Sequence, residues 1–156
     1  MKTSQSKAKL NGKPFKIAII LARYNDDLGS ELLENTTATL LKNGVIAKNI
    51  DVIRVPGALE IPLAAQMIAQ NKSHQAIIAL GIVIKGETAH FEHVSQQSHN
   101  GLMQVSLEQK IPVIFGILTV NNLKQATDRI SKTKLNKGQE YAEAAIEMAQ
   151  LLQKLQ

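Results

Sequence analysis

Residues 76–84 read Ala-Ile-Ile-Ala-Leu-Gly-Ile-Val-Ile, nine positions in a row without a polar or charged side chain. A strand with one face in water alternates apolar and polar residues, and this stretch does not alternate. The run is also far shorter than the roughly 20 apolar residues that a membrane-spanning helix needs. The stretch therefore predicts a β-strand buried on both faces, as in the interior of a parallel sheet.

Apolar runs on either side predict three further strands, at 16–22, 50–55 and 113–119. Helical patterns separate the strands. The first helix is expected to begin with Asp26 or Asp27 as its cap and to end at Asn43-Gly44, and the others to lie at 59–70, at 88–109, from about 122, and at 137–156. Strands that alternate with helices in this way form parallel sheets covered on both faces. We therefore expect an α/β fold, a three-layer α/β/α sandwich around a four-stranded parallel sheet.

The net charge of +5 is concentrated at the start of the chain. The first 16 residues hold Lys2, Lys7, Lys9, Lys13 and Lys16 and no acid, whereas the remainder balances its basic and acidic side chains. We interpret residues 1–13 as a flexible basic arm and residues 14–156 as a single domain. A basic arm can bind nucleic acid, but the few aromatic residues argue against base stacking, so a solvated arm is the preferred interpretation.

The composition excludes several classes of site. The chain has no cysteine, which excludes disulfides, cysteine-ligated zinc and iron–sulfur clusters. No apolar run is long enough to span a bilayer, and the polar first residues lack a signal-peptide pattern. We therefore expect a cytoplasmic protein that has no membrane partner.

Ligands of open parallel sheets bind at the carboxyl ends of the strands. In this chain those ends are followed by the segments 24–25, 56–60, 85–90 and 119–122. The Pro56-Gly57 turn lets backbone approach a ligand, and Glu60 places a carboxylate in the same region, although a carboxylate there also complements a helix dipole. Each segment is polar or contains glycine, so these four segments are the candidates for a binding site.

The segment after the 76–84 strand carries the most distinctive chemistry. Gly86 is expected to allow a tight turn, and the amides of Glu87 and Thr88 to open the next helix, a common position for a bound phosphate. His90 follows on the first turn, where its pKa suits proton transfer near neutral pH. The alternatives are an exposed histidine without a role, or a metal site shared with His93, for which no third ligand is evident.

Residues 121–138 hold the only basic cluster in the otherwise neutral part of the chain. Its members are Lys124, Arg129, Lys132, Lys134 and Lys137, against the single acid Asp128. Arginine suits bidentate phosphate binding, whereas most charge clusters are simply solvated. The residues thus predict an α/β enzyme that binds a small phosphorylated molecule and uses a histidine for proton transfer, without identifying the substrate.

Six motifs together resemble one known family. They are Ala-Arg-Tyr-Asn at 22–25, Pro-Gly-Ala-Leu-Glu-Ile-Pro at 56–62, Gly-Glu-Thr-Ala-His-Phe at 86–91, Phe-Gly-Ile-Leu-Thr at 115–119, Asp-Arg at 128–129 and Asn-Lys-Gly at 136–138. Their order and spacing are similar to those of the 6,7-dimethyl-8-ribityllumazine synthases of riboflavin biosynthesis, and the resemblance extends from Phe15 over nearly the whole chain. It implies a flavodoxin-like fold.

The resemblance also implies a reaction and a set of site residues. The family condenses 5-amino-6-(D-ribitylamino)uracil with 3,4-dihydroxy-2-butanone 4-phosphate, and it uses no metal and no organic cofactor. His90 matches the catalytic histidine, and Glu87, Thr88 and Arg129 match the phosphate-binding positions. The remaining substrate-binding positions correspond to Tyr24, Ala58, Leu59, Glu60, Ile82, Val83, Ile84, Phe115 and Lys137.

Assembly is the last property that the resemblance implies. Family members form homopentamers with active sites between neighbouring subunits, some form decamers or icosahedral 60-mers, and association with riboflavin synthase is possible. The chain departs from the usual pattern at Tyr24, where the family generally has Phe or Trp, and in the loop 131–135, which lacks the glycines of many capsid-forming members. A non-catalytic flavin- or lumazine-binding shell protein is the alternative from another functional class.

Overall fold

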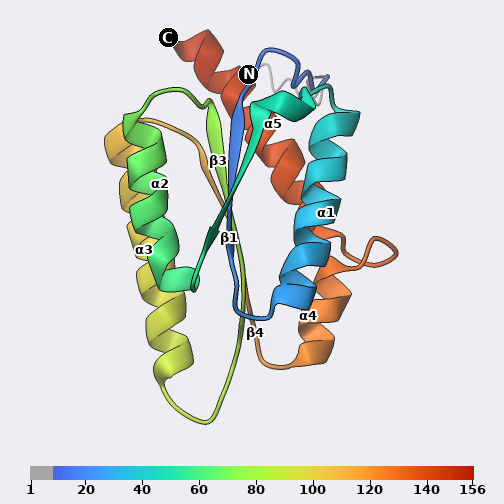
Figure 1. The fold of residues 1–156 in the computed structure, drawn as a ribbon, viewed down its shortest axis with the longest axis vertical. Coiled ribbons are helices and arrows are strands. Elements are labelled where there is room, and N and C mark those ends of the chain that lie inside the picture. Colours follow the sequence, from blue (N-terminus) through green and yellow to red (C-terminus); the bar gives the residue numbers. More distant parts are fainter. Residues whose placement is uncertain (1–8) are drawn as a thin grey trace, which may run out of the picture.

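The computed structural model describes residues 9–156, and it shows a sheet between two layers of helices (Figure 1). Four parallel strands, β1 (Ile17–Ala22), β2 (Ile50–Val55), β3 (Ala76–Ile84) and β4 (Val113–Val120), lie in the order β2-β1-β3-β4. The predicted three-layer α/β/α fold around a four-stranded parallel sheet is confirmed. The strand order is that of flavodoxin-like folds, in which the order reverses between β1 and β3.

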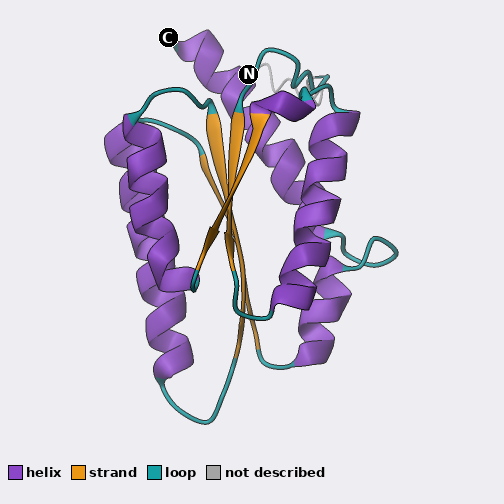
Figure 2. Ribbon diagram, viewed as in Figure 1, coloured by secondary structure: helices purple, strands orange, loops and turns teal. Residues whose placement is uncertain are grey.

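Helices cover both faces of the sheet (Figure 2). One layer contains α2 (Ile61–Gln70) and α3 (His90–Gln109), and the other contains α1 (Asp26–Lys42), α4 (Leu123–Ile130) and α5 (Lys137–Leu155). Two short 3₁₀ turns, η1 (Ala47–Asn49) and η2 (Ala58–Glu60), precede β2 and α2. Pro62 lies in the first turn of α2, where its missing N–H costs nothing.

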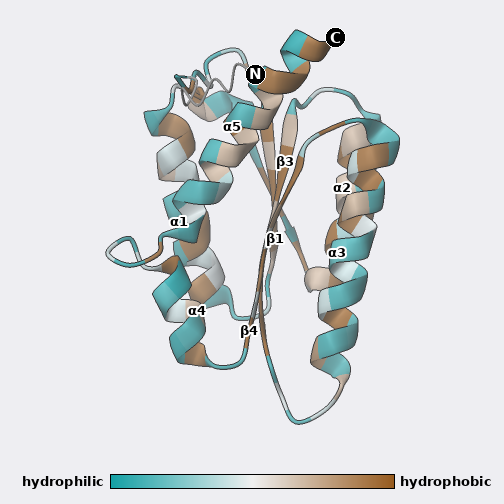
Figure 3. Ribbon diagram, turned by 180° about the vertical axis from the view of Figure 1, so that it is seen from behind, coloured by the Kyte–Doolittle hydropathy of each residue, from teal (hydrophilic) through white to brown (hydrophobic). Residues whose placement is uncertain are grey.

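The strands separate two hydrophobic cores. Every residue of β1 is buried, and alternate side chains point to opposite faces: Ile17, Ile19 and Leu21 join the core under α1 and α5, and the residues between them join the core under α2 and α3. Hydrophobic residues accordingly follow the strands between the two helical layers (Figure 3). β2 is not buried on both faces like β1. It lies at the edge of the sheet and exposes Val52 and Arg54.

Two local predictions at helix starts were wrong. Asn25, with φ 57°, rather than Asp26 or Asp27 occupies the cap position of α1. The helix expected from residue 88 begins at His90, so Glu87 and Thr88 lie in the preceding loop. The predicted end of α1 at Asn43-Gly44 is confirmed, and Gly44 follows the helix with φ 94°.

The beginning of the described chain lies against the domain. The Asn11 N–H donates to Gln150 Oε1 over 3.1 Å, the Gly12 N–H donates to the Asn43 carbonyl over 2.7 Å, and Leu10 packs on the core. The first eight residues of the expected arm lie outside the described residues. Within residues 9–156, no helix combines the length and the apolar character needed to cross a membrane.

Candidate active site

A cavity of about 370 Å³ lies where β1 and β3 end, at the point where the strand order reverses. This is the position at which flavodoxin-like sheets bind their ligands. Its walls come from the loop after β1, from η2, from the end of β3 and from the start of α3. The lining residues are Ala22, Tyr24, Asn25, Gly57, Ala58, Leu59, Ile82, Val83, Ile84, His90 and Val94.

The cavity brings together seven of the residues that the sequence singled out. Tyr24 follows β1, Ala58 and Leu59 form η2, and Ile82 to Ile84 end β3. His90 is the first residue of α3, and its exposed side chain also lines the cavity. Residues far apart in the sequence thus meet because parallel strands deliver their carboxyl ends to one edge of the sheet.

Gly57 has a steric role at the rim of this cavity. A Cβ at position 57 would lie 3.1 Å from Glu60 Oε2 and 3.3 Å from Tyr24 Cδ2, so any larger residue would displace one of these groups. The Glu60 carboxylate and the Tyr24 ring therefore both lie beside Gly57. Glu60 does not line the cavity itself, and 74% of Tyr24 is exposed.

The loop between β3 and α3 carries Glu87 and Thr88 next to the cavity. Both residues are exposed, and the His90 N–H approaches Thr88 Oγ1 at 3.4 Å. Because the helix begins only at His90, these two residues precede its amino end rather than form it. Glu92, in the first turn, has a lowered pKa, chiefly through a backbone hydrogen bond and also through Lys85, whose Nζ lies 3.4 Å from Glu92 Oε1.

The basic cluster of residues 121–138 contains one cation that differs from the rest. Lys124 and Lys134 both bond the Asp128 carboxylate, and these bonds lower its pKa to about 2. Lys132 pairs with Glu34 at 3.7 Å and Lys137 with Glu140 at 2.6 Å. Arg129, in contrast, donates from Nη1 to the Gln125 carbonyl over 3.1 Å, and it has no carboxylate partner among residues 9–156. Its charge is therefore the one most available to an anion.

Phe115, Arg129 and Lys137 do not line the cavity. Phe115 belongs to the edge strand β4, and its ring meets that of His99 edge to face with centroids 5.8 Å apart. Arg129 lies in the last turn of α4 and Lys137 begins α5, in the helical layer across the sheet from α2 and α3 (Figure 1). Within one chain these three residues are therefore apart from the cavity and not all together: Phe115 packs on the face of α2 and α3, and Arg129 and Lys137 lie in the opposite helical layer.

The sequence matches one known protein family over most of its length. The family model of 6,7-dimethyl-8-ribityllumazine synthase matches residues 14–153 of the 156 residues. The chain belongs to this family. It is accordingly an enzyme of the lumazine synthase type, in riboflavin biosynthesis.

Four residues of this lumazine synthase cavity were not predicted as site residues: Ala22, Asn25, Gly57 and Val94. Asn25 has the clearest sequence signal, because it lies in the polar segment that follows a buried strand and because asparagine is suited to a left-handed backbone. Its side chain donates from Nδ2 to the Ile82 carbonyl over 2.9 Å. Gly57 belongs to the Pro-Gly turn of a candidate segment, whereas Ala22 and Val94 are apolar and only their position in the fold identifies them.

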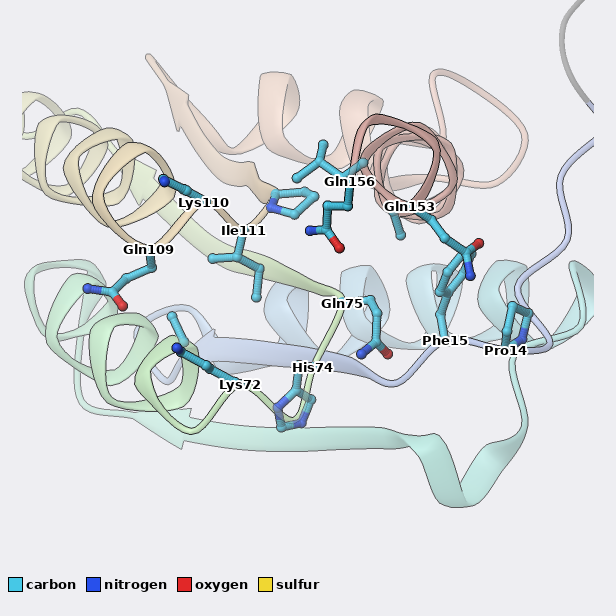
Figure 4. A pocket seen from close by; sticks show the side chains of 14 residues that line it. Pro14, Phe15, Lys72, His74, Gln75, Gln109, Lys110, Ile111, Gln153 and Gln156 are labelled. Atoms are coloured by element: carbon cyan, nitrogen blue, oxygen red, sulfur yellow. The ribbon is translucent and has the colours of Figure 1, made fainter.

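A second cavity, of about 550 Å³, lies at the opposite end of the lumazine synthase sheet (Figure 4). Lys72, Lys110 and several glutamine amides surround an apolar floor that includes Ile111. None of the predicted site residues lines it. Among residues 9–156, no group of three histidine, aspartate or glutamate side chains is arranged to hold a metal ion.

Proposed function

We propose that this enzyme condenses 5-amino-6-(D-ribitylamino)uracil with 3,4-dihydroxy-2-butanone 4-phosphate to form 6,7-dimethyl-8-ribityllumazine. The observation that carries the proposal is the cavity at the β1/β3 reversal, which gathers Tyr24, His90 and the end of β3 in a chain of this family. The 5-amino group forms an imine with the ketone and releases water. Phosphate is then eliminated, and closure of the ring with loss of a second water yields the lumazine.

The cavity wall suits the pyrimidine. A flat ring stacks favourably on an aromatic face, and Tyr24 supplies one at the cavity. Ala58, Leu59 and the end of β3 supply apolar contacts and backbone groups along the ring edge, and Glu60 lies beside Tyr24 as a polar partner for the ribityl chain. Lys137 is proposed as a second ribityl partner.

His90 is the proposed proton shuttle. Imine formation and phosphate elimination both move protons, and a histidine is suited to both directions near neutral pH. His90 lines the cavity in which the substrates are proposed to bind, and this supports the role. Much of the acceleration is expected from holding two substrates together, since the reaction is bimolecular.

The phosphate is proposed to bind Arg129 together with the backbone amides of Glu87 and Thr88. The available charge of Arg129 supports this role, since a guanidinium binds phosphate in bidentate geometry. Arg129, Lys137 and Phe115 lie apart from the cavity in one chain, so they are proposed to complete the cavity of a neighbouring subunit.

A homopentamer is the proposed assembly, with a decamer or a 60-mer as larger forms. The outer face of η2 and α2 supports a subunit contact, because Leu59, Leu63 and Met67 recur every four residues and are largely exposed. Light scattering will measure the particle mass. A pentamer gives about 85 kDa from the 17.0 kDa chain, a 60-mer gives about one megadalton, and a monomeric mass would contradict an interface site.

The proposed reaction is tested by mixing the protein with both substrates and following lumazine fluorescence. We expect formation well above the uncatalysed rate, and folded protein without an excess rate would contradict the proposal. The His90→Ala variant separates an enzyme from a non-catalytic lumazine-binding protein. It should lose rate by about 10²-fold or more while still binding lumazine, whereas a pure binding protein would show no rate to lose.

Two further properties belong to the proposal. A cytoplasmic location is expected for an enzyme of this type, and fractionation of cells that express it would test this. Association with riboflavin synthase is also proposed, and it predicts that the two proteins elute together from a sizing column.

A further inference from the structure

Asn25 adopts a backbone conformation that few residues tolerate. Its φ of 57° and ψ of 49° lie in the left-handed region at the cap position of α1. A cap residue usually accepts a hydrogen bond from its own helix, but the Asn25 side chain makes no such bond. Instead its amide Nδ2 donates to the carbonyl oxygen of Ile82, 57 residues away in the sequence, over 2.9 Å.

The acceptor of this bond, the Ile82 carbonyl, lies in the part of β3 that extends beyond its pairing with β1. The pairing of β1 with β3 ends at Leu21 and Leu80, while β3 continues to Ile84 beside β4. Backbone groups of a parallel strand face alternate neighbours, so the Ile82 carbonyl faces the side on which β1 has ended. The Asn25 amide therefore takes the place of the backbone donor that a longer β1 would have supplied.

This bond joins two walls of the active-site cavity. Tyr24, directly before Asn25, forms the aromatic wall, and Ile82 to Ile84 form the wall at the end of β3. Ile84 lies two residues beyond Ile82 and directs its backbone groups to the same side of the strand. A bond from Asn25 to Ile82 thus fixes the separation between the ring of Tyr24 and the backbone groups that border the cavity.

We propose that Asn25 is a positioning residue for the pyrimidine substrate, an assignment that rests on the proposed function. Two requirements together select asparagine at this position. The left-handed backbone favours Gly, Asn or Asp, and only Asn among these has a side-chain donor for a carbonyl at neutral pH. Asn25 acts through Tyr24 and the end of β3 and is not itself a catalytic residue.

The variant Asn25→Gly removes the donor and keeps the backbone conformation. We expect the KM for the pyrimidine to rise about tenfold, because one hydrogen bond is lost and the two walls separate. The KM for the phosphorylated ketone should stay within about twofold, because Asn25 does not contact the proposed phosphate residues. Asn25→Asp places an acceptor against the Ile82 carbonyl and should raise the pyrimidine KM further. This variant replaces Asn25→Gly in the test if the glycine variant does not fold.

Asn43→Gly is the matched control. Asn43 occupies the other end of α1, and its Nδ2 also donates to a carbonyl over 2.9 Å, that of Thr39, far from the cavity. It should lower the thermal midpoint and leave both KM values unchanged. If Asn25→Gly leaves the pyrimidine KM unchanged, or raises both KM values equally, the positioning role is wrong.

A binding titration separates this proposal from the proposed function. If the unmodified enzyme forms no lumazine, the reaction assignment fails, yet the fluorescence of added 6,7-dimethyl-8-ribityllumazine still reports on the cavity. Asn25→Gly should weaken lumazine binding about tenfold, and Asn43→Gly should leave it unchanged. Equal lumazine binding by the unmodified protein and Asn25→Gly would overturn the role of Asn25 whatever the activity.

Discussion

Arg129 stands out among the cations of its cluster because the lysines around it are already paired. Lys124 and Lys134 bond Asp128, and Lys137 bonds Glu140. A charge that is already neutralised contributes little to an anion outside the pair. The motif resemblance already implies a phosphate role for Arg129, and the structure adds that the lysines of the cluster are paired with carboxylates whereas Arg129 is not, among residues 9–156.

Replacing Arg129 with methionine should raise the KM for the phosphorylated ketone by at least about tenfold, because a charge-assisted hydrogen bond to phosphate is lost. Steady-state kinetics with saturating pyrimidine will measure this. Lys124→Met is the control, since it removes a charge from the same helix that is bonded to Asp128. Equal effects of the two variants would show that the net charge of α4, and not the guanidinium, holds the phosphate.

The ion pairs of Asp128 predict how the stability of the fold depends on pH. Lys124 and Lys134 donate to its carboxylate and lower its pKa from 3.8 to about 2, so folding favours the ionised form. Its contribution to stability is therefore complete above the unfolded pKa and is lost as the pH falls through about 2. Carbon-13 NMR of the Asp128 carboxyl should show a midpoint near 2 that rises with added salt, since exposed pairs are screened. A midpoint near 3.8 at low salt would contradict the pairing.

At the scale of elements, the approach of α5 to α1 depends on Gly138. A Cβ at this position would lie 2.9 Å from Asn35 Cβ and 2.9 Å from the Thr36 amide nitrogen. The amide belongs to the backbone of α1 and cannot move aside without shifting the helix. Because Lys137 begins α5, this close approach also determines where one of the proposed site residues lies.

Gly138→Ala should lower the free energy of unfolding by about 1–3 kcal/mol, the usual cost of forcing extra volume into a packed contact. Urea denaturation will measure the loss. Gly86→Ala is the matched control, because a Cβ there meets no atom within 4 Å and Gly86 lacks a positive φ. Its stability should change by less than about 0.5 kcal/mol, and a loss as large as that of Gly138→Ala would contradict the steric explanation.

The elements themselves could be predicted because their signals are local. The uninterrupted apolar run of β3 and the Asn43-Gly44 end of α1 are visible in a few consecutive residues. The start of α1 could not be predicted, because the Asn25 side chain bonds a carbonyl 57 residues away instead of capping its own helix. The pairing of the basic residues near Arg129 could not be predicted either. Lys132 and Lys137 pair with Glu34 and Glu140, and both carboxylates lie outside the segment 121–138.

The same limit applies to the site. The motifs name Tyr24, His90 and Arg129 together, but a motif does not say whether its residues meet within one chain. The structure separates them: Tyr24 and His90 line the cavity, and Arg129 lies in the helical layer on the other face of the sheet. That separation is a property of the topology, because α4 and α5 pack beside α1 on the face of the sheet opposite α2 and α3.

At the scale of the whole molecule, the proposed interface site takes a cavity group, which includes His90, from one chain and a second group, which includes Arg129, from its neighbour. This arrangement predicts that two inactive variants can complement one another. His90→Ala disables the cavity group and Arg129→Ala the second group. In a ring with head-to-tail contacts, the cavity of one subunit faces the second group of its neighbour. A mixed ring therefore contains some sites in which both groups are intact.

Refolding the two variants together at equal concentration should restore activity in about a quarter of the sites, since each group is intact in half of the subunits. Lumazine formation will measure it, and two controls bound the result. Each variant refolded alone should stay inactive, and the two mixed without refolding should recover activity only as fast as subunits exchange. If co-refolded particles contain both variants by mass spectrometry and remain inactive, both groups must act within one chain, and the proposed interface site is wrong.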